Sequence, residues 1–181
     1  KRTLESLNVG DFGNIIVLSY KYLEVQESDA KTLICLLHLR NICEQYDKDF
    51  NIVTEMLDLK NRELGVVAKA DDFIVGDNLI SLLLSQLSEN RVLKKVYDEL
   101  FRSEGSEIYL KPASRYIQTD LEVDYANIVA NAAALNETAI GYRYTSFSDD
   151  IDQNFGVKIN PHKNSKVKFS KNDFVIVLSE D

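Results

Sequence analysis

The sequence is short of several features, and each shortage excludes a class of protein. Its 181 residues contain no tryptophan, only two prolines and two cysteines, and seven glycines that stand singly. A dinucleotide-binding fold would carry GxGxxG after its first strand, and a phosphate-binding loop would carry GxxxxGK[ST]. Neither motif is present. The longest apolar runs, such as residues 33–39, are far shorter than the ~20 residues of a membrane span. We therefore expect no direct membrane insertion.

The net charge of the chain is negative, which disfavours binding to nucleic acid. Twenty-nine acidic residues against 21 basic ones give a formal net charge of −8, so a phosphate backbone would be repelled rather than attracted. A short basic stretch at residues 163–171 is followed by Asp173 and Glu180, and this pattern is typical of the solvated face of a hairpin. Nucleic acid is excluded as a partner.

The cysteines and histidines predict no metal site. Cys35 and Cys43 lie in one apolar helical pattern without a CxxC pair, and His38 and His162 have no zinc-ligand spacing. We interpret all four as structural residues, and two lone thiols fit a reducing compartment. No nucleophile–base pair is visible either, so the sequence predicts a protein that is not an enzyme.

Residues 14–75 show the pattern of a parallel sheet. Apolar, β-branched runs at residues 14–19, 51–56 and 72–75 predict strands, and residues 30–46 and 61–69 predict helices between them. Such alternation is typical of right-handed parallel crossovers. The continuous apolarity of the first run predicts a strand covered on both faces. Ser28 and Asp77 are predicted N-caps of the helices that follow them.

A long helical stretch from Asp77 towards Arg102 carries more apolar surface than one covering helix needs. Ser88, Glu89 and Asn90 predict a bend or a second N-cap within it. The spare apolar face predicts an interface, either with the following subdomain or with a second copy of the chain. The predicted interface residues are Leu79, Leu82, Leu83, Leu87, Leu93, Val96 and Tyr97.

The pattern of apolar and polar residues changes after Gly105. Residues 107–110, 138–144, 156–159 and 174–178 predict strands, and the Ala-rich stretch 125–135 predicts one helix. The predicted fold class is therefore α/β: a partial Rossmann-like parallel sheet with a long helix that offers an interface over residues 1–104, followed by a small, β-rich α+β subdomain over residues 105–181.

Acidic residues gather at the predicted carboxyl ends of the parallel strands, where ligands bind in such sheets. Glu55 and Asp58 flank the second strand, and Asp29 and Asp77 lie near the ends of the first and third. These carboxylates could hold a cation or act as acid and base. The alternative is that two of them cap helices and two are solvated loop acids.

Several stretches resemble the CASTOR/POLLUX/SYM ion-channel family in order and spacing. Residues 14–112 are similar to its conserved cytoplasmic region, through segments 16–19, 28–33, 52–58 with Asn61, 72–79 and 104–112. Segments 139–143, 160–161 and 172–177 are similar to the C-terminal subdomain of Trk-like regulators of potassium conductance (RCK domains). The resemblance implies the later half of an RCK domain plus that subdomain.

This resemblance implies a cytoplasmic gating-ring module of a cation or potassium channel, which senses a ligand or ion and assembles as dimers or rings. The implied partners are further copies of the chain and the pore domain of its own parent chain. Two alternatives stay open: half of a nucleotide-dependent oxidoreductase-like domain, which needs the missing glycine loop, and a protein-interaction scaffold that senses nothing.

The resemblance also suggests calcium as a ligand. Asp150, Asp152 and Asn154 alternate along an acidic loop and could converge oxygens on Ca²⁺. The EF-hand pattern fails, because Phe155 stands where glycine is required and Pro161 where the bidentate glutamate belongs. A solvated loop is the alternative. The second candidate calcium set is Glu55, Asp58 and Asp77.

Overall fold

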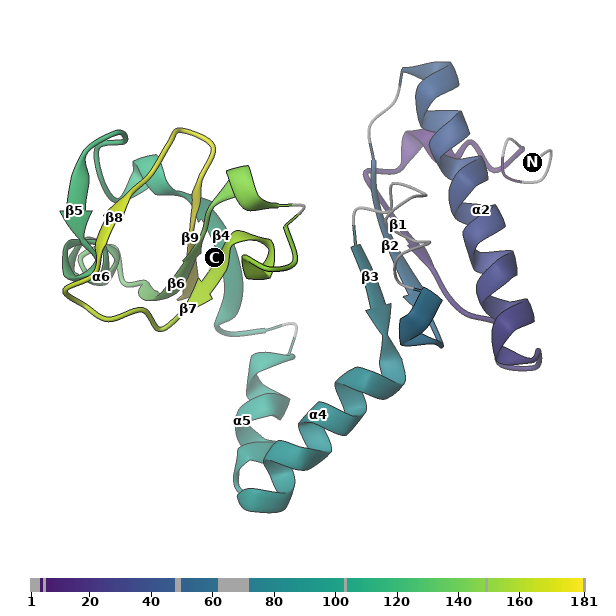
Figure 1. Ribbon diagram of the computed structural model, residues 1–181, viewed down its shortest axis with the longest axis horizontal. Helices are drawn as coiled ribbons and strands as arrows, with labels where there is room; N and C mark the ends of the chain where they lie inside the picture. The colour runs from purple at the N-terminus through teal and green to yellow at the C-terminus, as the bar shows by residue number, and fades with distance from the viewer. Residues whose placement is uncertain are drawn as a thin grey trace. The chain divides into compact units, whose positions relative to one another are not determined.

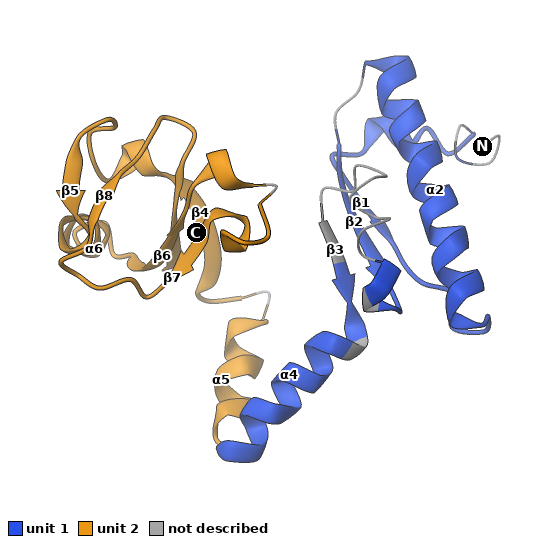
Figure 2. Cartoon of the chain, in the orientation of Figure 1, with its two compact units in different colours: residues 1–91 blue, residues 92–181 orange. Residues whose placement is uncertain are grey.

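The computed structural model describes residues 4, 6–47, 50–61, 72–102, 104–148 and 150–180, leaving out the side chains of Leu59, Asp72, Phe73 and Asp77. It divides into two compact units, residues 1–91 and 92–181 (Figure 2). This division precedes helix α5 (Leu93–Leu100). The domain boundary near Gly105 stays a prediction.

The first unit contains the predicted parallel sheet. Strands β1 (Asn14–Val17), β2 (Asn51–Met56) and β3 (Asp72–Val75) lie in the order β1-β2-β3 (Figure 1). Both pairs are parallel, with Ile16 opposite Val53 and Glu55 opposite Ile74. All three carboxyl ends therefore meet at one edge. The α/β prediction is confirmed.

Helix α2 (Val25–Tyr46) packs along this sheet (Figure 1). Leu36, Leu39 and Ile42 recur at helical spacing, and all three are buried against Phe50 and Ile52. Each such side chain contributes roughly 1.5–3 kcal/mol through burial. This core fixes the helix on one face of the sheet.

Two predictions about helix starts are wrong. Helix α2 begins at Val25, after the N-cap Glu24, rather than after Ser28. The Ser28 side chain is buried, and its Oγ accepts a hydrogen bond from the Tyr20 N–H at 2.9 Å, so it serves a neighbouring loop instead of its own helix. Helix α4 (Gly76–Glu89) has Val75 rather than Asp77 as its N-cap.

The prediction that the first strand is covered on both faces is also wrong. Ile15 and Val17 pack into the core, whereas Ile16 is 70% exposed and Leu18, just beyond the strand, is 67% exposed. Among the described residues, α2 covers one face of the sheet. The strand therefore alternates in burial although its sequence does not alternate in polarity.

The predicted stretch from Asp77 to Arg102 forms two helices. Helix α4 ends at Glu89, Asn90 has extended backbone angles, and α5 (Leu93–Leu100) follows. The predicted break at residues 88–90 is confirmed. The predicted helix at residues 61–69 lies outside the described residues from residue 62 onward, and Leu59–Asn61 form a 3-10 turn, η2.

The second unit is a small antiparallel fold. Its four-stranded sheet has the order β4 (Glu107–Pro112), β9 (Phe174–Ser179), β6 (Thr138–Arg143) and β7 (Val157–Ile159). A two-stranded sheet pairs β5 (Glu122–Asp124) with β8 (Lys166–Lys168), two strands that the sequence did not predict. The predicted helix is α6 (Tyr125–Ala133).

Short 3-10 turns complete the two units: η1 (Val9–Asp11), η3 (Ala113–Arg115), η4 (Thr145–Phe147) and η5 (Asn154–Gly156).

Aromatic side chains fill the core of the second unit. The Tyr142 ring meets Phe169 edge-on at 5.4 Å and Tyr144 at 5.0 Å, between centroids, geometries that aromatic pairs favour. Burial raises the pKa of Tyr125 in this core to about 12. Over the described part of the chain, no helix is both long and apolar enough to cross a membrane.

Candidate functional site

Polar side chains gather at the carboxyl edge of the parallel sheet. Ser19 follows β1, Glu55 lies near the end of β2, and Asp58 comes just after β2. The Oε2 atom of Glu55 accepts hydrogen bonds from the Ser19 N–H at 2.9 Å and from the Ser19 hydroxyl at 2.7 Å. The bond from the Ser19 hydroxyl has the largest effect on the pKa of Glu55, followed by the bond from the Ser19 N–H. Both lower this pKa, although burial acts in the opposite direction. Glu55 therefore joins the ends of β1 and β2 as a carboxylate.

Asp29 holds the turn that follows β2. Its side chain is 1% exposed and accepts hydrogen bonds from the backbone N–H groups of Leu57 at 2.9 Å and Asp58 at 3.1 Å. The Asn61 side-chain amide donates a third bond to it at 2.7 Å. Carboxylates bonded in this way fix loop geometry strongly. Asp29 thus holds helix α2 to the turn at the carboxyl end of strand β2.

Asp58 is engaged in the same network. Its Oδ1 accepts from the Lys60 N–H at 2.9 Å, and its Oδ2 accepts from the Gln26 side-chain amide at 3.0 Å. The structure thus brings Glu55, Asp58 and Asp29 to one edge, as predicted, and gives each its own hydrogen-bond donors. The Asp77 side chain lies outside the described residues. Where the chain is described, no three His, Cys, Asp or Glu side chains are grouped to hold a metal. The set Glu55, Asp58 and Asp77 stays a prediction.

The acidic loop of the second unit forms a compact turn. The Oδ1 of Asp150 accepts from the N–H groups of Asp152 at 2.9 Å and Gln153 at 3.2 Å, while the Asn154 amide donates to the Val157 carbonyl at 3.0 Å. The second oxygen of Asp150, the Asp152 carboxylate and the Asn154 carbonyl oxygen are not used in these bonds. Phe155, at the EF-hand glycine position, has a left-handed φ of 54°. This candidate calcium set also stays a prediction.

The predicted interface residues differ in exposure. Leu79, Leu82 and Val96 are exposed, by 45%, 58% and 48% respectively. The half-buried members of the set are Leu83, Leu87, Leu93 and Tyr97. The structure adds Ile80 and Leu84, both exposed. Helix α4 therefore presents apolar side chains on more than one side.

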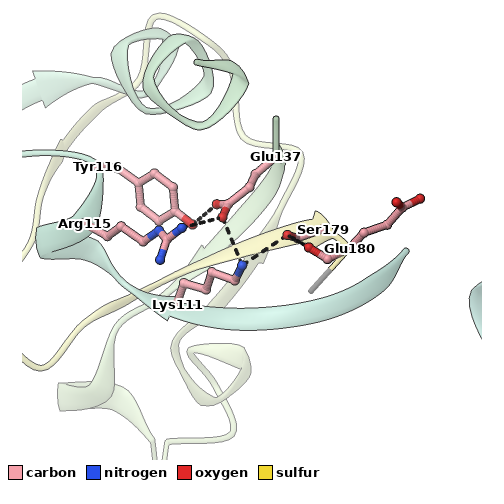
Figure 3. A network of polar contacts seen from close by, with 6 residues as sticks. All are labelled: Lys111, Arg115, Tyr116, Glu137, Ser179 and Glu180. Atoms are coloured by element: carbon pink, nitrogen blue, oxygen red, sulfur yellow. Dashed lines mark hydrogen bonds and ion pairs between the residues drawn. The ribbon is translucent and has the colours of Figure 1, made fainter. Parts of the chain in front are cut away.

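Sequence reasoning missed a buried ionic network in the second unit (Figure 3). Glu137 is 5% exposed, and its Oε1 accepts from Lys111 Nζ at 2.9 Å and Arg115 Nη2 at 3.1 Å. The Tyr116 hydroxyl donates to the other oxygen, Oε2. Lys111 also donates to Ser179 Oγ at 3.1 Å. The Glu137 carboxylate therefore joins η3 to β4, and Lys111 extends the network to β9.

The charge state of Glu137 follows from these partners. Burial alone raises the pKa of this carboxyl, but hydrogen bonds from Tyr116 and Lys111, with the positive charges of Lys111 and Arg115, outweigh burial and lower it. Burial and the bond to Glu137 raise the pKa of Tyr116. Glu137 is therefore an anion, and Tyr116 a neutral donor, at neutral pH.

Comparison with known proteins identifies relatives over the whole chain. No protein-family model matches it. The probable ion channel POLLUX of Oryza sativa subsp. japonica is 28% identical over 210 residues, covering 99% of this chain and 21% of the relative. The ion channel POLLUX of Lotus japonicus is 28% identical over 213 residues (100% and 22%), and the ion channel CASTOR of Lotus japonicus is 26% identical over 210 residues (99% and 24%). The chain spans less than a quarter of the length of these three.

Solved structures give weaker matches. A GsuK channel bound to NAD aligns with a TM-score of 0.41 and 13% identity, covering 99% of this chain and 27% of that one. A GsuK RCK domain aligns with a TM-score of 0.38 and 16% identity, covering 99% and 33%. These scores are too low to define a shared fold. The sequence similarity, which extends over essentially the whole chain, confirms that this protein resembles the CASTOR and POLLUX ion channels.

Proposed function

We propose that this chain is a regulatory module of a cation channel, acting on the cytoplasmic side of the membrane rather than as an enzyme. The observation that carries the proposal is the similarity to plant ion channels over 99% of the chain, which corresponds to 21% to 24% of those relatives. The RCK-like motifs of the sequence support the same role. A regulatory module acts on a pore by having different ligand affinities in its two conformations.

The first unit offers a physical route for such coupling. Strand β3 runs directly into helix α4 at Gly76. A Cβ atom added at Gly76 would lie 3.6 Å from Oε1 of Glu55. The carboxylate edge and the start of α4 are therefore neighbours. A ligand that moved Glu55 would act on the helix that we propose as part of the interface between subunits.

Self-association is the second part of the proposal. Exposed leucines on α4 leave apolar surface in water, at a cost of about 25 cal/mol per Å² that pairing would recover. Because RCK-type modules assemble with themselves, the proposed occupant is a second copy. Continuing the same contact around a closed ring would place several copies under one pore.

We expect the chain to form dimers or larger assemblies, and the double substitution Leu79→Glu with Leu82→Glu, two exposed positions on one face of α4, to convert them into monomers. Two buried, unpaired carboxylates are incompatible with an apolar interface. Sedimentation velocity measures the effect. Ile159→Glu changes an apolar side chain of similar exposure (56%) on β7 and is the control. A monomer at high concentration, or a double variant that still dimerises, would contradict this interface.

We also expect saturable heat on titration with Ca²⁺ and much less with Mg²⁺, because the acidic loop offers irregularly placed oxygens that suit calcium better. Isothermal calorimetry on two paired variants locates the site. If the loop binds, Asp150→Ala with Asp152→Ala abolishes the heat, while Glu55→Gln with Asp58→Asn retains it. If instead Glu55→Gln with Asp58→Asn abolishes the heat and the loop variant retains it, Ca²⁺ binds at the carboxyl edge of the parallel sheet. No heat in the unmodified chain would refute both calcium sets and favour a scaffold that senses nothing.

A further inference from the structure

A groove of about 590 Å³ lies in the second unit, between the η3 segment and helix α6. Ser114 to Gln118 form one wall, Asn127, Ala130 and Asn131 form the opposite one, and Leu121 and Val123 complete the lining. The volume is within the range of small-molecule sites, ~300–1,000 Å³. No part of the proposed channel role accounts for it.

The charge in this groove is opposite to that of the chain. The chain carries 29 acidic residues, yet among the described residues that line the groove none is acidic and Arg115 alone is cationic. Lys111 and Arg115 share the single carboxylate of Glu137, which leaves one uncompensated positive charge in this network. The Arg115 side chain is 50% exposed and that of Lys111 18%. The accessible positive charge therefore belongs to Arg115.

Arg115 is also held in place. Its Nη2 donates to Glu137, which the Tyr116 hydroxyl and Lys111 fix from the other sides (Figure 3). A guanidinium has five N–H donors, so this bond leaves most of them for a ligand. A preorganised donor loses less entropy on binding than a mobile one.

The remaining lining is amphiphilic. The Asn131 amide donates to the Tyr116 carbonyl at 2.6 Å, which leaves its own oxygen as an acceptor. Gln118 and Asn127 make no side-chain hydrogen bond within the described ranges. Leu121 is 51% exposed, and with Val123 it supplies apolar surface. Amides, an apolar wall and one guanidinium together suit a ligand with an acidic group and an apolar body.

We propose that this groove binds a small organic anion, with its acidic group paired to Arg115 and its apolar body against Leu121 and Val123. The inference stands on the groove alone and does not depend on the channel role. A carboxylate fits the guanidinium through two parallel hydrogen bonds, and the amides of Gln118 and Asn127 provide orientation. A planar aromatic carboxylate is the simplest member of this class.

The test compares benzoate with benzamide, which has nearly the same shape but no charge, on the whole isotopically labelled chain by NMR. We expect benzoate to shift the side-chain amide signals of Gln118, Asn127 and Asn131 saturably, with a Kd of roughly 1 mM for so small a ligand. Benzamide should bind at least about fivefold more weakly, because it lacks the charge-assisted bonds.

Three variants make the result specific. Arg115→Gln should remove the preference for benzoate, whereas Lys158→Gln, at an exposed position on β7, should keep it. Ala130→Phe fills the groove from helix α6, at a residue that is not itself part of the Glu137 network, and should abolish binding of both probes. Equal binding of the two probes, shifts confined to other residues, or no shift at all would overturn the proposal. So would benzoate binding that survives Ala130→Phe.

Discussion

Replacing Glu137 by alanine is expected to lower the free energy of unfolding of residues 92–181 by about 3 kcal/mol. The substitution leaves Lys111, whose side chain is only 18% exposed, without its counter-ion. It also removes the acceptor of the buried Tyr116 hydroxyl. A partner removed from a buried pair leaves an uncompensated charge, and this penalty exceeds the original attraction. Half-exposed Arg115 contributes little, because water solvates it.

Chemical denaturation of the whole chain measures this loss. Monitoring the unfolding through amide hydrogen exchange in β4, β6 and β9 reports it separately for the second unit. A loss of about 3 kcal/mol corresponds to a fall in Tm of about 15 °C for a unit of this size. Glu122→Ala removes an exposed carboxylate from the same unit, and we expect it to change stability by less than about 0.5 kcal/mol. Equal effects of the two substitutions would show that the network contributes nothing to stability.

The loss should depend on pH in a defined direction. The pKa of Glu137 is lowered in the folded chain, so its stabilisation is fully present above the unfolded value of about 4.3 and disappears as pH falls through the folded value. The difference between the unmodified chain and Glu137→Gln should therefore be constant near neutral pH and shrink below about pH 4. A difference that grows on acidification would contradict the assigned ionic state.

The second large effect is expected from Asp29→Ala, at about 3 kcal/mol in the first unit. Asp29 is 1% exposed and is the acceptor for the N–H groups of Leu57 and Asp58 and for the Asn61 amide. Alanine leaves the Leu57 and Asp58 N–H groups without this acceptor, and each unmet bond costs about 1–3 kcal/mol. The Asn61 amide keeps its longer bond to Gln26 Oε1 at 3.4 Å. The turn after β2 should consequently open.

Hydrogen exchange at the Leu57 and Asp58 amides reports this opening directly. Exchange should accelerate about a hundredfold in Asp29→Ala, the factor that about 3 kcal/mol provides when opening is local. Asp29→Asn keeps one acceptor oxygen and should give an intermediate rate, while Asp11→Ala, at an exposed residue of η1, should leave the rate unchanged. Unchanged exchange in Asp29→Ala would mean that Asp29 does not hold this turn.

The parallel strands could be predicted from sequence because their β-branched runs are continuous and bounded by turn residues. The start of α2 could not be predicted in the same way. Ser28 and Asp29 are strong caps by local chemistry, but the fold uses Ser28 for the Tyr20 N–H and Asp29 for the turn after β2. Strands β5 and β8 each hold a single valine between two charged residues, so no apolar run marks them in the sequence.

The candidate sites also differ in how far the sequence could predict them. The acids Glu55 and Asp58 could be placed at one edge because the carboxyl ends of parallel strands meet there. The Glu137 network has no local signal: Lys111 lies 26 residues from Glu137 and 68 from Ser179. The pairing of β4 with β9, which sets Lys111 opposite Val175, brings these two distant strands together. Contacts between distant segments of an antiparallel sheet follow from topology, which no spacing in the sequence reveals.

The most direct test of the regulatory role is to record currents from the Lotus japonicus channel POLLUX after its aligned segment, 22% of that protein, is replaced by this chain. The proposal predicts that the chimera conducts, and that the double substitution Leu79→Glu with Leu82→Glu in it alters or abolishes the current. An unrelated domain of equal length in the same position should not support conduction. A chimera that reaches the membrane without conducting, or a current indifferent to which domain is inserted, would contradict the proposed role.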